Sequence, residues 1–138
     1  MENYMKKTIK LCNKALKNKD IPVGCIIVKN NKIISKAYNK KYLNKDVTAH
    51  AEIIAIRKAC KKLKTTHLDE CELYVSLEPC MMCTSAIVQS HIKKVIYCLK
   101  SPKYGYLLKV AKSNKIECIQ MYDQGYEKLL KNFFTDKR

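Results

Sequence analysis

Glycine and proline are scarce in this sequence, with three residues of each among 138. The chain therefore has no flexible linker rich in Gly, Pro or Ser, and it shows no internal repeat and no low-complexity segment. A repeat architecture and a string of tethered domains are excluded. We expect one domain over residues 1–138, which is long enough to bury a single hydrophobic core without disulfide bonds.

Long apolar runs are missing as well. The first twenty residues lack the apolar segment of a signal peptide, and no stretch approaches the roughly 18 residues that span a bilayer. We therefore expect a cytoplasmic protein with no membrane contact. In a reducing compartment the eight cysteines are expected to be free thiols, two as metal ligands and six as small buried apolar side chains.

Acidic residues are few. The sequence has 12 Asp and Glu against 28 Lys and Arg, which gives a formal net charge of +16. Such a field attracts a polyanion, most commonly a nucleic acid. Only Arg57 and Arg138 are arginines, and this preference for Lys explains the type of cation but not the shortage of acids. Because lysines act as point charges, the surface should hold phosphates rather than read bases.

The apolar periodicity predicts an α/β protein. Five strands are predicted at residues 21–29, 32–38, 72–77, 93–98 and 115–120. Helices are predicted at residues 4–18, 48–62 and 79–90, with an amphipathic helix at the C-terminus and a loop over 99–113. This order is typical of a three-layer α/β/α fold with a five-stranded mixed sheet and helices on both faces.

Two of the predicted helices have more detailed expectations. Thr48 is a candidate N-cap for the second helix. The inward side chains of that helix are expected to be those of Ile53, Ile56 and Cys60. The stripe of the C-terminal helix ends in Phe133 and Phe134, which are either both core residues or divided between the core and an RNA-facing surface.

Two short motifs concentrate metal-binding side chains. They are His-Ala-Glu at residues 50–52 and Pro-Cys-Met-Met-Cys at residues 79–83. His50, Cys80 and Cys83 offer three zinc ligands, and three protein ligands leave a fourth position open for water, as in catalytic zinc sites. Each motif alone is weak, but both together arise by chance on the order of once in a thousand sequences. Their spacing matches H-x-E…P-C-x-x-C, the known signature of zinc nucleobase deaminases.

Glu52 lies two residues from a ligand without being one, which suits a general base. At such a site the pKa of water falls toward ~7, Glu52 takes its proton, and the oxygen attacks the amidine carbon of a base. Glu52 then protonates the ring nitrogen and later the departing amine. The alternative is a closed structural site, completed by a fourth protein ligand. Its candidates are Cys71, Cys98, His67 and His91, none of which belongs to a second ligand pair.

Over nearly the whole chain the sequence resembles the bacterial tRNA-specific adenosine deaminases. The matching stretches are residues 46–53 and 73–83, extended by residues 21–24, 86–88, 92–95 and 132–134. The resemblance implies a cytidine-deaminase-like fold, a homodimer and one Zn²⁺ per subunit. It also implies hydrolysis of adenosine to inosine, with release of ammonia, at the first anticodon position of a tRNA.

The resemblance further implies individual roles. His50, Cys80 and Cys83 correspond to zinc ligands and Glu52 to the proton shuttle. Residues expected to bind the substrate, Asn39 by contacting the flipped base, are Asn39, Val23, Ser101 and Lys103. The sequence departs from the family at two positions, with Val47 where proline is usual and Ser101 where aspartate is favoured.

Two other functions remain open from the sequence. A deaminase of a free base or nucleoside, such as guanine or cytosine, would use the same motifs, although the net charge of +16 favours RNA. A non-catalytic zinc module is the second alternative, but such a module has no need of a carboxylate at Glu52.

Overall fold

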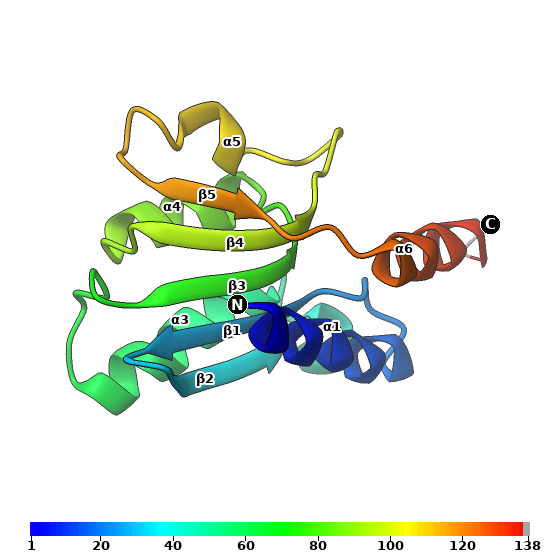
Figure 1. The fold of residues 1–138 in the computed structure, drawn as a ribbon. Helices are drawn as coiled ribbons and strands as arrows, with labels where there is room; N and C mark the ends of the chain where they lie inside the picture. The colour runs from blue at the N-terminus through cyan, green and yellow to red at the C-terminus, as the bar shows by residue number, and fades with distance from the viewer. Residues whose placement is uncertain (137–138) are drawn as a thin grey trace.

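The computed structural model describes residues 1–136, so Arg138 lies outside the described part. Its five strands form one sheet in the order β2-β1-β3-β4-β5 (Figure 1). β1 is antiparallel to β2 and β3, whereas β3, β4 and β5 are parallel, so the predicted mixed sheet is confirmed. The strands are β1 (Gly24–Lys29), β2 (Lys32–Tyr38), β3 (Glu72–Leu77), β4 (Lys94–Leu99) and β5 (Glu117–Gln120).

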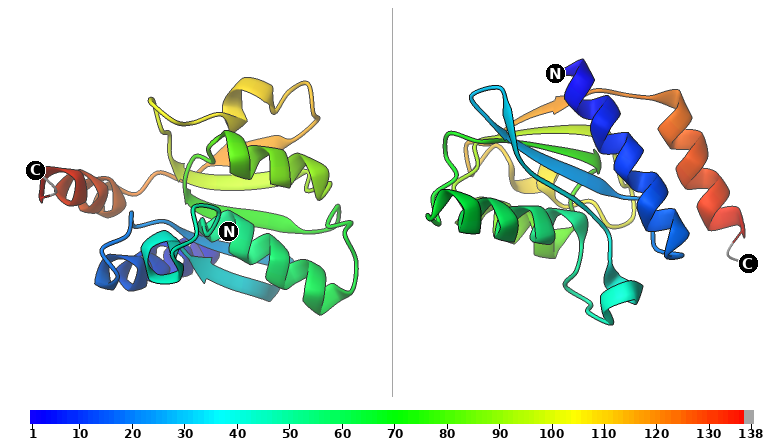
Figure 2. Two further views of the ribbon diagram at one scale, coloured as in Figure 1. Left: turned by 180° about the vertical axis from the view of Figure 1, so that it is seen from behind. Right: turned by 90° about the horizontal axis from the view of Figure 1, so that it is seen from below.

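Helices cover both faces of the sheet, which gives the expected three layers (Figure 2). α1 and α6 pack on one face, and α3, α4 and α5 pack on the other. The helices are α1 (Glu2–Lys17), α2 (Lys41–Asn44), α3 (Ala51–Leu63), α4 (Met81–Gln89), α5 (Leu107–Val110) and α6 (Gln124–Asp136). None of those within residues 1–136 has the length and apolar character needed to cross a bilayer.

The alternation of side chains along the strands produces two cores. Along β1, Ile26 and Val28 face α1 and α6, while Cys25 and Ile27 face α3 and α4. Because both faces are covered, the central strands are apolar almost throughout rather than alternating with polar residues. The two cores fix the sheet between the helix layers, and this sets the relative positions of the helix N-termini described below.

The start of α3 differs from the prediction. Thr48 is not the N-cap, because its hydroxyl and backbone N–H both bond to Asp46 Oδ1, at 2.7 and 2.9 Å, in the preceding turn. The helix begins at Ala51 with His50 as N-cap. Its buried face consists of Ala51, Glu52, Ala55 and Ala59, whereas the expected Ile53, Ile56 and Cys60 are only partly buried. Small alanines allow the helix to lie close to the sheet, so the larger side chains point sideways.

Other boundaries shift by two or three residues. β1 begins at Gly24, where pairing with Tyr38 starts, rather than at residue 21, and β5 begins at Glu117. α4 begins at Met81 with Cys80 as N-cap, so Pro79 precedes the helix instead of opening it. Two four-residue helices, α2 and α5, were not predicted, and α5 lies within the expected loop. Helices this short depend on tertiary contacts rather than on their own sequence.

Candidate active site

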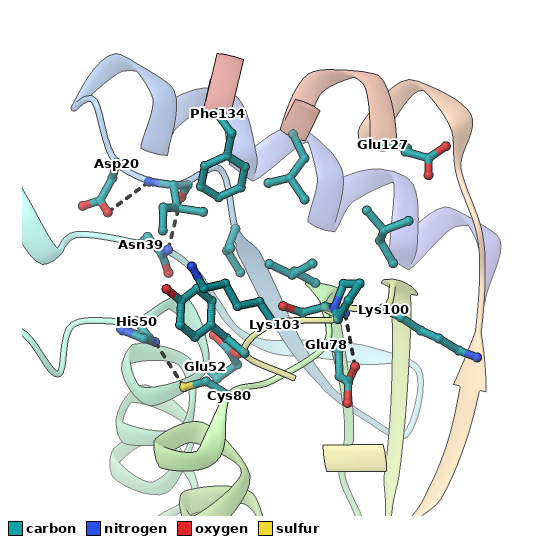
Figure 3. A pocket seen from close by; sticks show the side chains of 18 of the residues that line it. Asp20, Asn39, His50, Glu52, Glu78, Cys80, Lys100, Lys103, Glu127 and Phe134 are labelled. Atoms are coloured by element: carbon teal, nitrogen blue, oxygen red, sulfur yellow. Dashed lines mark hydrogen bonds between the residues drawn. The ribbon is translucent and has the colours of Figure 1, made fainter. Parts of the chain in front are cut away.

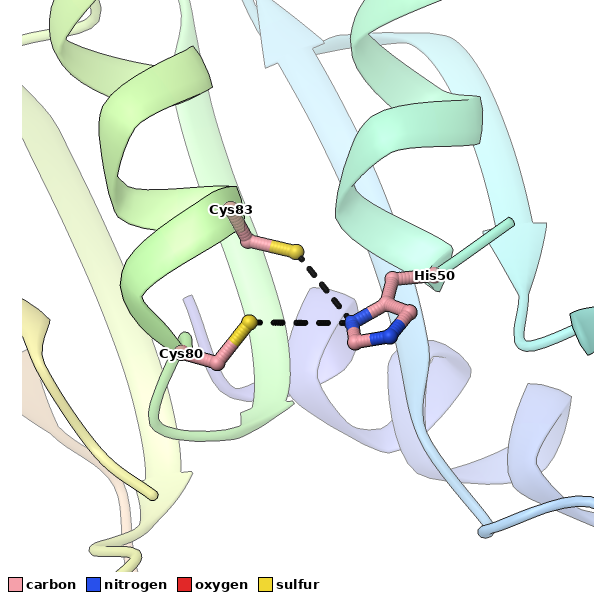
Figure 4. A group of neighbouring side chains, drawn as sticks. All are labelled: His50, Cys80 and Cys83. Atoms are coloured by element: carbon pink, nitrogen blue, oxygen red, sulfur yellow. Dashed lines mark hydrogen bonds between the residues drawn. The ribbon is translucent and has the colours of Figure 1, made fainter. Parts of the chain in front are cut away.

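The three candidate metal ligands lie at the beginnings of two adjacent helices. His50 is the N-cap of α3, Cys80 is the N-cap of α4, and Cys83 lies in the first turn of α4. Both helices pack on the same face of the sheet and begin at the same level, so the three side chains converge (Figure 4). Residues 80 and 83 are one helical turn apart, which points both sulfurs to one side.

The geometry of this triangle fits a tetrahedral zinc ion. His50 Nδ1 lies 3.5 Å from Cys83 Sγ and 3.7 Å from Cys80 Sγ, and the three ligand atoms lie within 4.8 Å of one another. Zn–S bonds of about 2.3 Å and Zn–N bonds of about 2.0–2.1 Å at tetrahedral angles require N···S separations of about 3.6 Å. The residues present therefore fit the ion.

The charge state of the sulfurs suits metal binding. The thiol of Cys83 and the imidazole of His50 hydrogen-bond to the Cys80 sulfur, and the backbone N–H of Cys83 also points to it. These contacts lower the pKa of Cys80 to about 4. The same thiolate, together with burial, raises the pKa of Cys83 in the metal-free chain. A divalent cation would relieve that repulsion and stabilise both thiolates.

Glu52 lies beside the triangle and is almost completely buried, at 4% exposure. Burial raises the pKa of its carboxyl from 4.5 to about 7. A carboxyl group whose pKa lies near neutrality can both accept and return a proton at physiological pH. Its place two residues into α3 brings it to the pocket on the same side as the ligands (Figure 3).

The pocket in front of the triangle has a volume of about 870 Å³. His50, Glu52 and Cys80 line it, whereas Cys83 is fully buried behind them. The structure also brings every residue expected to bind the substrate to its wall, namely Asn39, Val23, Ser101 and Lys103. The sequence motifs and the resemblance thus select residues that lie around one cavity.

The side-chain amide of Asn39 makes two hydrogen bonds, one through its oxygen and one through its nitrogen. Its carbonyl oxygen accepts the N–H of Ala51 at 2.8 Å, and its amide nitrogen donates to the carbonyl oxygen of Ile21 at 3.1 Å. It therefore caps the first turn of α3 from twelve residues upstream, a role that Thr48 was expected to fill. The second amide hydrogen remains for a group in the pocket.

Several wall residues were not found from the sequence motifs. α6 contributes Leu130, Lys131 and Phe134 to the side of the pocket opposite α3 and α4 (Figure 3). Phe134 is 51% exposed, so the interpretation of both C-terminal phenylalanines as core is wrong. Tyr104, in the segment after β4, adds a second exposed aromatic ring to the wall. Only the apolar stripe of the C-terminal helix hinted at this wall.

The residues considered for a closed zinc site lie elsewhere. His67 and His91 are both exposed and stack on each other, with ring centroids 4.5 Å apart. Cys71 and Cys98 are buried in the two opposite cores. Within residues 1–136, the cluster of potential metal ligands consists of His50, Cys80 and Cys83. None of the eight cysteines forms a disulfide, as expected. Of the six expected to be buried apolar side chains, four are buried, whereas Cys60 and Cys118 are only partly buried.

The α/β/α fold and the His/Cys/Cys triangle beside a buried glutamate are the defining features of the zinc-dependent nucleobase deaminases. The chain matches the MafB19-like deaminase family over residues 1–138. It is 47% identical to a tRNA-specific adenosine deaminase of Aquifex aeolicus (strain VF5), over 79% of this chain and 72% of that protein. The chain therefore belongs to the MafB19-like deaminases and to the tRNA-specific adenosine deaminases.

Solved structures show the same fold. A structure from work on A-to-I editing by tRNA:A34 deaminases at the wobble position of transfer RNA superposes with a TM-score of 0.86. It is 28% identical, with 94% of this chain and 99% of that chain covered. A guanine deaminase from Bacillus subtilis gives a TM-score of 0.68 at 31% identity, covering 99% and 92% of the two chains.

Proposed function

We propose that this chain hydrolyses adenosine to inosine at the first anticodon position of a tRNA and depends on one zinc ion per subunit. The triangle of His50, Cys80 and Cys83, with Glu52 beside it at the wall of an open pocket, is the observation that carries the proposal. We also propose that the reaction takes place in the cytoplasm. From the family resemblance we also propose a homodimer, which the mass of the native protein in solution would test.

His50, Cys80 and Cys83 would hold the metal through one nitrogen and two sulfurs. Bound zinc would supply a Lewis acid that makes water ionise near neutral pH. The open side of the triangle faces the cavity, so a base entering the pocket meets the reacting water there. Since Cys83 is fully buried, solvent and substrate reach the site from the side of His50 and Cys80.

Glu52 would move the protons of the reaction. Its carboxylate accepts a proton from the attacking water and delivers it to the purine nitrogen next to the reacting carbon. The exocyclic amine is protonated by the same route and leaves as ammonia, and a carbonyl group takes its place. The buried position of Glu52 keeps the carboxyl from bulk water, so the proton returns to the substrate rather than to solvent.

The walls of the pocket would hold the flipped base. The free amide hydrogen of Asn39 can donate to a ring nitrogen, while Val23 offers an apolar contact. Ser101 and Lys103 also line the pocket and could contact the ribose or phosphate group attached to the base. The cavity of about 870 Å³ is near the upper end of the range for small-ligand pockets, which leaves room for a neighbouring nucleotide.

A polynucleotide substrate is favoured over a free base by charge. The net charge of +16 attracts a phosphate backbone, and a neutral base such as guanine gains nothing from it. Four lysines line the pocket, at positions 41, 100, 103 and 131. The 47% identity to the tRNA-specific adenosine deaminase of Aquifex aeolicus supports the same choice. So does the TM-score, which is 0.86 with the tRNA:A34 deaminase structure and 0.68 with the guanine deaminase.

Incubation of the zinc-loaded protein with an anticodon stem-loop that carries adenosine at the wobble position, followed by sequencing for inosine, tests this proposal. A stem-loop with guanosine at that position is the matched control, and free guanine, cytosine and adenosine run alongside. We expect inosine in the first stem-loop alone. Turnover of free guanine without inosine in RNA would overturn the proposal in favour of a free-base deaminase.

A further inference from the structure

Glu78 has a buried carboxylate that takes no part in the proposed metal binding or proton transfer. It comes directly after β3, two residues before Cys80, and is 8% exposed. Its Oε1 accepts the backbone N–H of Ser101 at 3.2 Å, and its Oε2 accepts that of Leu108 at 3.1 Å. One side chain thus holds both ends of the segment 101–108, which we call the strap.

The backbone around Glu78 adds further bonds to the strap. The carbonyl oxygen of Pro79 accepts the N–H of Tyr106 at 3.0 Å, and the N–H of Glu78 donates to Leu99, just before the strap, at 2.8 Å. The short segment that leads into Cys80 is therefore bonded to the strap along its length. Lys103 and Tyr104 belong to the strap and line the pocket. A shift of the strap would therefore move one wall of the pocket.

Gly105 shows how closely the strap is folded around the carboxylate. A Cβ atom at this position would lie 2.3 Å from Glu78 Oε1 and 2.5 Å from the carbonyl oxygen of Ser101. The φ angle of Gly105 is not positive, so glycine is required here for space and not for backbone conformation. A larger residue would have to push the carboxylate away from the strap.

Within the strap, the N–H of Gly105 donates to the carbonyl oxygen of Ser101 at 2.9 Å, and Leu107 is fully buried near the C-terminal end. Residues 101–106 belong to no helix or strand, and Pro102, Lys103 and Tyr104 are exposed. Hydrogen bonds to an ionised acceptor are roughly twice as strong as neutral ones. A carboxylate offers an oxygen to each N–H, whereas the amide of a glutamine would have to turn its NH₂ group toward one of them.

We propose that Glu78 is a positioning residue for the RNA substrate: its carboxylate holds the strap so that Lys103 and Tyr104 keep their places at the pocket wall. This rests on the proposed function, because the strap residues are taken to contact RNA. Since both carboxylate oxygens are bonded to backbone N–H groups, Glu78 acts through the strap and not on the reacting atoms.

The substitution Glu78→Gln tests the proposal, because it preserves shape and removes one acceptor. We expect KM for the stem-loop to rise about tenfold, kcat to stay within about twofold, and zinc content to remain unchanged. Amide hydrogen exchange at Ser101 and Leu108 should accelerate about tenfold or more. Glu72→Gln, at the other end of β3 in an ion pair with Lys94, is the matched control and should leave all four quantities unchanged.

Gly105→Ala tests the same contact from the opposite side. It should raise KM as Glu78→Gln does, and the double variant should add less than about threefold to either one, because both break one contact. A fall in kcat or zinc content at unchanged KM would overturn the proposal in favour of a role at the metal. Unchanged exchange at Ser101 and Leu108 would overturn it as well.

These readouts separate the two proposals. If the wild-type chain makes no inosine, the proposed function fails, and the exchange rates at Ser101 and Leu108 still decide whether Glu78 anchors the strap. If the wild-type chain makes inosine and Glu78→Gln has the KM of the wild type, only the positioning role fails.

Discussion

Glu52 illustrates how a single functional residue opposes the stability of its own fold. Its carboxyl is buried next to two cysteine sulfurs and carries a pKa raised from 4.5 to about 7 by burial. Between pH 4.5 and about 7, the folded metal-free chain therefore keeps a proton on Glu52 that the unfolded chain has already released. The contribution of Glu52 to stability is therefore most favourable below pH 4.5 and is lost as the pH rises to about 7.

Glu52→Gln should therefore stabilise the metal-free protein while abolishing its activity. At pH 8 we expect the free energy of unfolding to rise by up to roughly 3 kcal/mol, the equivalent of the pKa shift; near pH 4.5 the variant and the wild type should be about equal. Inosine formation should fall by at least about 100-fold. Urea denaturation at both pH values measures the first effect, and equal stability at pH 8 would show that Glu52 is not held in an unfavourable charged state.

At the scale of elements, the contact between α1 and β1 depends on the absence of one side chain. Gly24 opens β1, and a Cβ atom there would lie 2.2 Å from the carbonyl oxygen of Thr8 in α1 and 3.0 Å from the Cβ of Leu11. The N–H of Gly24 also donates to the hydroxyl of Ser76 in β3 at 3.1 Å. Helix and strand backbones thus approach each other at this point, directly after Val23, which lines the pocket.

Gly24→Ala should destabilise the fold by about 2 kcal/mol or more, because the methyl group must push two backbones apart. Gly125→Ala is the matched control. A Cβ there would meet only Asp123 Oδ1, at 3.1 Å, and no backbone atom, so we expect a smaller loss of stability than at Gly24. Thermal and urea unfolding compare the two variants. If both lost the same stability, close packing of α1 on β1 would not be what requires glycine.

At the scale of the whole molecule, charge decides which substrates approach. The chain carries 28 cationic and 12 acidic residues, and the structure has only two ion pairs among its described residues, Lys29–Glu70 and Lys94–Glu72. Most lysines are therefore available to a phosphate backbone. Binding through phosphates releases counterions and weakens steeply as salt increases, which distinguishes RNA from a small neutral substrate.

Lys131→Gln should reduce the salt dependence of stem-loop binding, because Lys131 projects from α6 at the pocket. The slope of log K against log salt concentration should fall by about one when a single phosphate contact is lost. Lys62, which is also exposed and lies at the opposite end of α3 from His50, provides the control: Lys62→Gln should leave the slope unchanged. Titrations between about 50 and 200 mM salt measure this, and a wild-type slope near zero would contradict binding through phosphates.

Much of the fold and the metal triangle could be predicted from the sequence alone. The strands and long helices follow from apolar periodicity, which is a local property. His50, Cys80 and Cys83 follow from two motifs whose spacing within each motif is short, and Glu52 from its place beside a ligand. The hairpin turn at Asn30 and Asn31, both with positive φ, is also encoded locally, since asparagine tolerates that conformation.

Tertiary structure alone decided what surrounds these residues. Asn39 caps α3 in place of Thr48, Glu78 holds the strap from more than twenty residues away, and α6 brings Phe134 to the pocket. Each of these contacts joins segments whose separation in the chain carries no periodic signal. They exist because two cores place the helices and strand ends at one edge of the sheet, and packing energy summed over the whole molecule, not any local propensity, determines that placement.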